Sequence, residues 1–113
     1  MTSAITTHVL DTALGRPAVG VPVRLEQRID GDQWRPLGAG VTDVDGRIRE
    51  IGPGRVPSGT YRFTFDTGDY FAADGRETFF PEVTITFSVT DPDSHYHVPI
   101  LLSPFSVSTY RGS

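Results

Sequence analysis

The sequence predicts an all-β sandwich of about eight short strands with one short helix, and three observations support this prediction. Apolar and polar residues alternate with a period of two in several segments. Clusters of Gly, Pro, Asp and Ser separate these segments, and one segment alone has the composition of a helix. We expect residues 1–113 to form one domain, because a second core would leave each part too small.

The alternation is clearest in three segments, which we interpret as half-buried antiparallel strands. These segments are Val21–Arg28, Tyr61–Asp66 and Val83–Val89. Weaker alternation predicts five further strands, at Ile5–Leu10, Trp34–Val41, Arg47–Ile51, His95–Leu102 and Phe105–Tyr110. Dipeptides such as Asp45-Gly46 and Pro53-Gly54 supply the tight turns between them.

One helix is expected at residues 67–74. Thr67 is a candidate N-cap, Asp69 lies in the first turn, and Ala72 and Ala73 are compatible with a helix. Gly75 then provides a residue that can end the helix with positive φ. The predicted fold is therefore a sandwich with a single helical segment between its fifth and sixth predicted strands.

Composition excludes several classes of function. The net charge is −4, and all ten basic residues are Arg scattered along the chain, so no nucleic-acid partner is expected. The absence of cysteine excludes disulfides and Cys-type zinc sites. No apolar stretch approaches the ~20 residues that span a bilayer, and the first residues do not resemble a secretory leader. We therefore expect a soluble, cytoplasmic protein that does not contact membranes.

Three histidines are candidates for chemistry. His95 and His97 lie two residues apart on a predicted strand, so both side chains share a face, opposite to the apolar residues Tyr96 and Val98. His8 lies in the first predicted strand, where it shares its face with Thr6 and Leu10. Outward histidines are usually solvated. The His-x-His spacing also permits two zinc ligands, but no third ligand is evident nearby.

Arg47 and the last four residues are further candidates. Arg47 follows the Asp45-Gly46 turn, where it is a solvated strand residue, a member of a surface ion pair, or a fixed cation for a planar anionic ligand. Strand alternation continues as far as Tyr110. Docking of this strand would hold Ser113 near a fixed place, whereas composition alone favours a frayed tail over residues 111–113.

Two long strings resemble the transthyretin family. They are Ile5–Ala18 and the stretch from His95-Tyr96-His97-Val98-Pro99 to Tyr110-Arg111-Gly112-Ser113. The closing Tyr-Arg-Gly-Ser resembles the 5-hydroxyisourate hydrolase branch and not transthyretin proper, a hormone carrier. The resemblance covers nearly the whole chain and implies a transthyretin-like (prealbumin-like) eight-stranded sandwich.

The resemblance also implies an activity and a site. The expected reaction opens 5-hydroxyisourate to 2-oxo-4-hydroxy-4-carboxy-5-ureidoimidazoline in urate degradation, with no cofactor and no metal. His8, Arg47, His97 and Ser113 match the catalytic positions, and His8, Arg47, Tyr110 and Ser113 are expected to bind substrate. The family implies a homotetramer, a dimer of dimers, whose shared cleft is lined by residues 110–113. The alternative is a transthyretin-like carrier of small aromatic ligands.

Overall fold

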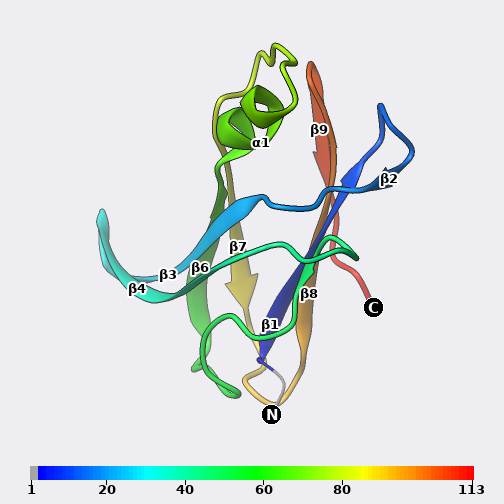
Figure 1. Cartoon of the computed structure of the whole chain (residues 1–113). Helices are drawn as coiled ribbons and strands as arrows, with labels where there is room; N and C mark the ends of the chain where they lie inside the picture. Colours follow the sequence, from blue (N-terminus) through cyan, green and yellow to red (C-terminus); the bar gives the residue numbers. More distant parts are fainter. Residues whose placement is uncertain (1–2) are drawn as a thin grey trace.

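The computed structural model describes residues 3–113, which form two packed β-sheets and one helix (Figure 1). The bounds of the elements are β1 Ile5–Asp11, β2 Arg16–Pro17, β3 Pro22–Asp30, β4 Gln33–Val41, β5 Arg47–Ile48, β6 Gly59–Phe65, α1 Thr67–Ala73, β7 Val83–Val89, β8 Tyr96–Ser103 and β9 Ser106–Thr109. The predicted all-β sandwich with one short helix is confirmed. Within the described residues no helix is both long and apolar enough to cross a membrane.

The two sheets differ in how their strands run. One sheet has the order β4-β3-β6-β7, and all its pairs are antiparallel, as the clear alternation in β3, β6 and β7 predicts. The other has the order β2-β1-β8-β9, with β5 also paired to β1. In this second sheet β1 and β8 run parallel, in register from Ile5↔Tyr96 to Asp11↔Leu102. Strands from opposite ends of the chain therefore lie side by side at its centre.

The core lies between the sheets and takes one face of each strand. Alternate residues of β1 and β8 are buried, and the buried set includes Val9, Val98, Ile100 and Leu102. The facing sheet contributes Leu25 and the aromatic side chains Tyr61, Phe63 and Phe65. Burial of each such side chain stabilises the fold by roughly 1.5–3 kcal/mol. The same packing directs the intervening residues of β1 and β8 away from the core.

Two local predictions need correction, and one short strand was not predicted. The strand expected at 47–51 ends at Ile48, after which the chain leaves β1 while Ile51 still packs in the core. The two-residue strand β2 was not predicted, because two residues carry no period. Thr67 is not the N-cap: Asp66 takes that position, and the buried Thr67 hydroxyl donates to the Phe80 carbonyl at 2.5 Å. The predicted end of the helix is confirmed, since Gly75 follows it with φ of 67°.

A buried ion pair joins the end of β1 to the segment that follows α1. Asp11 is fully buried, and its carboxylate accepts hydrogen bonds from the Arg76 guanidinium and the Tyr70 hydroxyl, both at 2.7 Å. The Leu14 amide donates to the other oxygen at 2.9 Å. Figure 1 shows α1 at the end of the sandwich opposite the N-terminus. This network therefore anchors the helical end of the molecule to the strand that carries His8.

Candidate active site

The outward face of β1 and β8 carries the predicted histidines. His8 and His97 are half-buried, while the residues on either side of each in its strand lie in the core or are tightly packed. The predicted outward orientation of His8 and His97 is therefore confirmed. His95 lies one residue before β8 and is exposed.

Strand pairing brings the candidate residues together. The parallel register of β1 and β8 sets Thr6 opposite His97, and the antiparallel pairing of β1 with β5 sets His8 opposite Arg47. Neighbouring strands lie about 4.8 Å apart, so outward side chains at these positions face a common space. Three strands, β5, β1 and β8, thus supply Arg47, His8 and His97 in that order across the sheet.

A tight turn holds Arg47 at the start of β5. The Asp43 carboxylate accepts hydrogen bonds from the backbone amides of Asp45, at 2.9 Å, and Arg47, at 3.0 Å. These hydrogen bonds lower the pKa of Asp43, and the bond from the Arg47 amide has the largest effect. Gly46 has φ of 75°, and a Cβ there would meet the Val9 carbonyl oxygen at 2.4 Å, so the turn requires glycine. None of the ion pairs among residues 3–113 involves Arg47, so its guanidinium is available to a ligand.

The C-terminal segment is ordered against β8. After β9 the chain turns back, and the Gly112 amide donates to the His97 carbonyl at 2.8 Å. A Cβ at Gly112 would come within 2.5 Å of Cδ2 of the His97 ring, so only glycine permits this approach. Tyr110 and Ser113 line the same groove as His97. The frayed-tail alternative for residues 111–113 is therefore wrong at Gly112, which pairs with β8.

Arg111 departs from the expectation that all four residues from 110 to 113 line the cleft. Its guanidinium lies over the Tyr96 ring, with Cζ 4.5 Å from the ring centroid. It contributes to a separate, smaller hollow beside β7 and not to the groove that contains His97. The residue therefore holds the segment in place through a cation–π contact.

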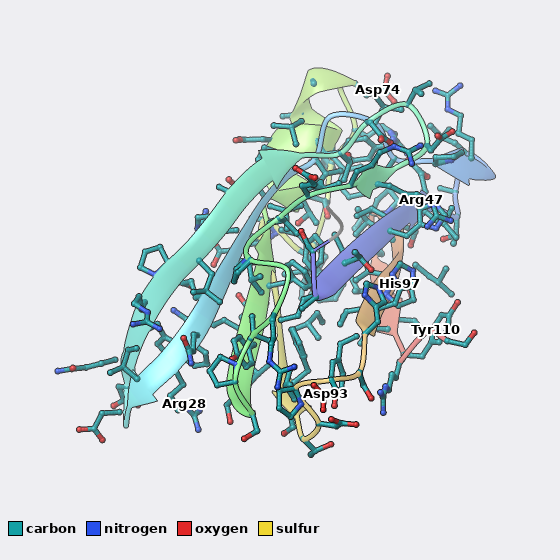
Figure 2. The ribbon with its side chains drawn as sticks, turned by 90° about the horizontal axis from the view of Figure 1, so that it is seen from below. Arg28, Arg47, Asp74, Asp93, His97 and Tyr110 are labelled. Atoms are coloured by element: carbon teal, nitrogen blue, oxygen red, sulfur yellow. The ribbon has the colours of Figure 1, made fainter. Side chains whose placement is uncertain are left out.

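The candidate residues other than Arg111 line an open groove of about 810 Å³ on the outer face of the β1–β8 sheet. Figure 2 shows Arg47, His97 and Tyr110 on the side of β1 that lies away from Arg28 at the tip of the β3–β4 hairpin. The groove is lined by polar and charged side chains together with a few apolar ones, and it includes His8, Arg47, Arg49, His97, Tyr110 and Ser113. Its size suits a small polar molecule.

Two of the histidines that line the groove, His97 and His8, have different hydrogen-bond partners. Burial lowers the pKa of His97, and the positive charge of Arg47 and the neighbouring His8 and His95 lower it further. A neutral His97 is therefore favoured near pH 7. Its Nδ1 lies 2.8 Å from the Thr6 hydroxyl. His8 Nε2 lies 2.8 Å from the Asp45 carbonyl oxygen. Because a carbonyl oxygen can only accept, Nε2 carries a hydrogen and donates it, and Nδ1 is the ring nitrogen that this bond does not use.

Sequence patterns gave no functional role to one residue that contacts His97 in the groove. Thr6 contacts both His95 and His97, and its only signal in the sequence is that it shares a strand face with His8. Gly112 falls within the predicted cleft-lining residues 110–113, but its close contact with the His97 ring was not predicted. Within residues 3–113, no three His, Cys, Asp or Glu side chains are grouped so that they could hold a metal ion.

The fold and the groove define a transthyretin-like sandwich with a histidine-lined outer face, and the comparisons agree. The model of the HIUase/Transthyretin family matches residues 5–112, and the chain belongs to this family. A 5-hydroxyisourate hydrolase of Salmonella dublin is 46% identical over 110 residues, covering 96% of this chain and 80% of the relative.

Solved structures give the same result. The 5-hydroxyisourate hydrolase of Klebsiella pneumoniae is 39% identical with a TM-score of 0.84, covering 96% of this chain and 98% of the other. Sea bream transthyretin in complex with thyroxine is 32% identical with a TM-score of 0.88, covering 96% of this chain and 94% of the other. An (S)-allantoin synthase is 38% identical with a TM-score of 0.87, and this chain, matched over 99% of its length, spans 44% of that one.

Proposed function

We propose that this protein is a hydrolase that opens 5-hydroxyisourate to 2-oxo-4-hydroxy-4-carboxy-5-ureidoimidazoline in the degradation of urate. The observation that carries the proposal is the meeting of His8, Arg47 and His97 in one groove beside Tyr110 and Ser113. Relatives that bear the name 5-hydroxyisourate hydrolase, across nearly the full length of this chain, support the same reaction. The cytoplasmic location remains a prediction.

The reaction adds water across an amide-like C–N bond of the six-membered ring. The water oxygen bonds to the carbonyl carbon, the C–N bond breaks, and one proton of the water goes to the departing nitrogen. The site must therefore accept a proton, stabilise negative charge on the carbonyl oxygen, and deliver a proton. Amino-acid side chains can perform all three of these functions.

His97 is the proposed general base. An imidazole can accept the water's proton only when it is neutral, and burial together with Arg47 lowers the pKa of His97 and so favours that form. The resulting imidazolium can return the proton to the departing nitrogen. His8 is its proposed partner in the acid–base pair, because Nδ1 remains for proton exchange while Nε2–H is engaged with the Asp45 carbonyl.

Arg47, Tyr110 and Ser113 are the proposed substrate-binding residues. The guanidinium of Arg47 offers several N–H donors and a fixed positive charge, which suit a carbonyl oxygen that becomes negative during attack. Tyr110 is 58% exposed and lines the groove, so its hydroxyl is free to hydrogen-bond a polar ring. The Ser113 hydroxyl is a candidate for relaying a proton.

We further propose a homotetramer, a dimer of dimers, in which two copies of the outer face meet. The groove is open to solvent in the single chain, and hydrolytic sites gain electrostatic strength when water is excluded. Light scattering at several concentrations measures the assembly. A monomer at assay concentrations would contradict a shared cleft.

The activity is tested by following the ultraviolet decay of freshly generated 5-hydroxyisourate with and without the protein. We expect decay well above the spontaneous rate, with saturation by substrate. Decay at the spontaneous rate would overturn the proposal. If that result came with tight binding of an aromatic ligand such as thyroxine, it would favour the carrier alternative.

Arg47 gives a pH prediction. Because its charge lowers the pKa of His97, Arg47→Gln is expected to raise that pKa toward the ordinary value. A base acts above its pKa, so the acid limb of the kcat/KM profile should move to higher pH. We also expect kcat/KM at the plateau to fall on the order of 10²-fold through loss of charge stabilisation.

Arg47→Lys is the matched control, because it keeps the charge but loses the planar fork of donors. Its acid limb should stay near that of the parent, although its plateau falls. An acid limb that moves equally in both variants would contradict the electrostatic role. The measurement is kcat/KM from about pH 5 to 9 at constant ionic strength.

A further inference from the structure

Thr6 connects two histidines on the outer face of the sheet. Its Oγ lies 2.8 Å from Nδ1 of His97 and 2.9 Å from Nε2 of His95. The β1–β8 register places Thr6 beside His97, and the side chain of Thr6 is half-buried while that of His95 is exposed. The reaction proposed above gives His95 and Thr6 no role.

The chemistry of the three groups limits where their hydrogens can lie. A hydroxyl donates one hydrogen bond, and a neutral imidazole carries a hydrogen on only one of its nitrogens. If His97 carries its hydrogen on Nδ1, Thr6 accepts it and donates its own hydrogen to Nε2 of His95. If His95 carries its hydrogen on Nε2, Thr6 accepts that one and donates to Nδ1 of His97. If both rings donated to Thr6, neither ring nitrogen could accept the hydroxyl hydrogen, so the bonding of the three groups favours the first two arrangements.

The two arrangements differ in what His97 offers to the groove. In the first, Nε2 of His97 has a free lone pair and can accept a proton from water. In the second, Nε2 carries the hydrogen and cannot act as a base. The hydrogen bond at one ring nitrogen thus decides the chemistry at the other.

We propose that Thr6 and His95 are positioning residues that hold His97 in its Nδ1–H tautomer, through the chain His97 Nδ1–H to Thr6 Oγ–H to His95 Nε2. This inference rests on the proposed function of His97 as the base. The same Nδ1–H bond persists when His97 becomes an imidazolium, so one arrangement serves both proton-transfer steps. This series of hydrogen bonds resembles the one in a catalytic triad, where a third group orients the base. Here a neutral hydroxyl and a second imidazole are the orienting groups.

The test compares Thr6→Val with Thr6→Ser. Valine keeps the branched shape suited to a strand but removes the hydroxyl, and serine keeps the hydroxyl. We expect Thr6→Val to lower kcat on the order of 10-fold or more with KM little changed, and Thr6→Ser to stay near the parent. His95→Phe, which removes the terminal acceptor, should lower kcat in the same direction.

Nitrogen-15 NMR of the histidine rings, in the absence of substrate, provides a readout independent of activity. In the parent, at a pH where His97 is neutral, Nδ1 of His97 should give the shift of a protonated nitrogen and Nε2 that of an unprotonated one. In Thr6→Val the two shifts should move toward each other as the second tautomer becomes populated. Thr6→Ser should keep the parent pattern.

Three results would overturn the inference. They are an unchanged nitrogen-15 pattern in Thr6→Val, parent-like kcat in Thr6→Val, and a loss in Thr6→Ser as large as in Thr6→Val, which would indicate a packing effect of the methyl group. A parent that does not hydrolyse 5-hydroxyisourate would overturn the proposed function instead. The NMR experiment would still decide whether Thr6 sets the tautomer of His97.

Discussion

Replacement of His97 by asparagine is expected to lower kcat/KM for 5-hydroxyisourate by about 10²–10⁴-fold, the range for loss of a general base. The Asn side chain keeps a polar atom close to the place of Nδ1, which lies 2.8 Å from the Thr6 hydroxyl. It has no counterpart of Nε2 and cannot take up a proton near neutral pH. The loss of kcat/KM should therefore result from the missing base and not from a change in the structure of the groove.

Two controls separate chemistry from structure. The variant should keep the circular dichroism spectrum, the thermal midpoint within a few degrees and the assembly size of the parent. His95→Asn is the matched substitution, because His95 also lines the groove but is exposed and is linked to His97 through Thr6, and we expect a smaller loss there. A His97→Asn variant as active as the parent would remove His97 from the mechanism.

Replacement of Asp11 by alanine is expected to lower the free energy of unfolding by about 3–5 kcal/mol, the range for breaking one side of a buried ion pair. The variant leaves the Arg76 guanidinium without its buried carboxylate, and it also removes the acceptor of the Tyr70 hydroxyl and the Leu14 amide. Urea unfolding at neutral pH measures the loss. Two protein concentrations distinguish unfolding from subunit dissociation.

Asp74→Ala provides the matched control. Asp74 also pairs with Arg76, at 2.9 Å, but its side chain is 57% exposed, so the expected loss is at most about 1 kcal/mol. Equal losses in Asp11→Ala and Asp74→Ala would contradict the central role of the buried pair.

The pH dependence of stability follows from the same network. Burial alone would raise the pKa of Asp11, but hydrogen bonds from Arg76, Tyr70 and Leu14 outweigh it and hold this pKa below its ordinary value. A carboxylate with a lowered pKa stabilises the fold above its unfolded-state pKa, and this contribution is lost as pH falls through the folded-state value. Asp11→Ala should therefore lose less stability than the parent between neutral and acidic pH.

The elements that follow a clear period could be predicted from the sequence. In β3, β6 and β7 one face is buried, so apolar residues recur at every second position, and this recurrence was sufficient to locate them. The two-residue strands β2 and β5 lack such a signal. Their place depends on pairing with β1, which lies elsewhere in the chain.

The sequence alone indicates which residues are candidates for the site, but it does not indicate how they are arranged. His8, Arg47 and His97 matched family positions, whereas Thr6 had no such marker. Thr6 and His97 are 91 residues apart in the sequence and meet only because β1 and β8 pair in parallel. The close approach of Gly112 to the His97 ring likewise requires the chain to turn back after β9.

The sequence by itself determined which of the longer segments are strands and which of their side chains point outward, including His8 and His97. Side-chain direction is a local property of an extended chain, since successive residues alternate between faces. Tertiary structure alone decided which outward side chains are neighbours, that Arg111 stacks on Tyr96 away from the groove, and that Thr6 lies between two histidines. These contacts join residues far apart in the chain, so they depend on strand register and core packing, which no local pattern contains.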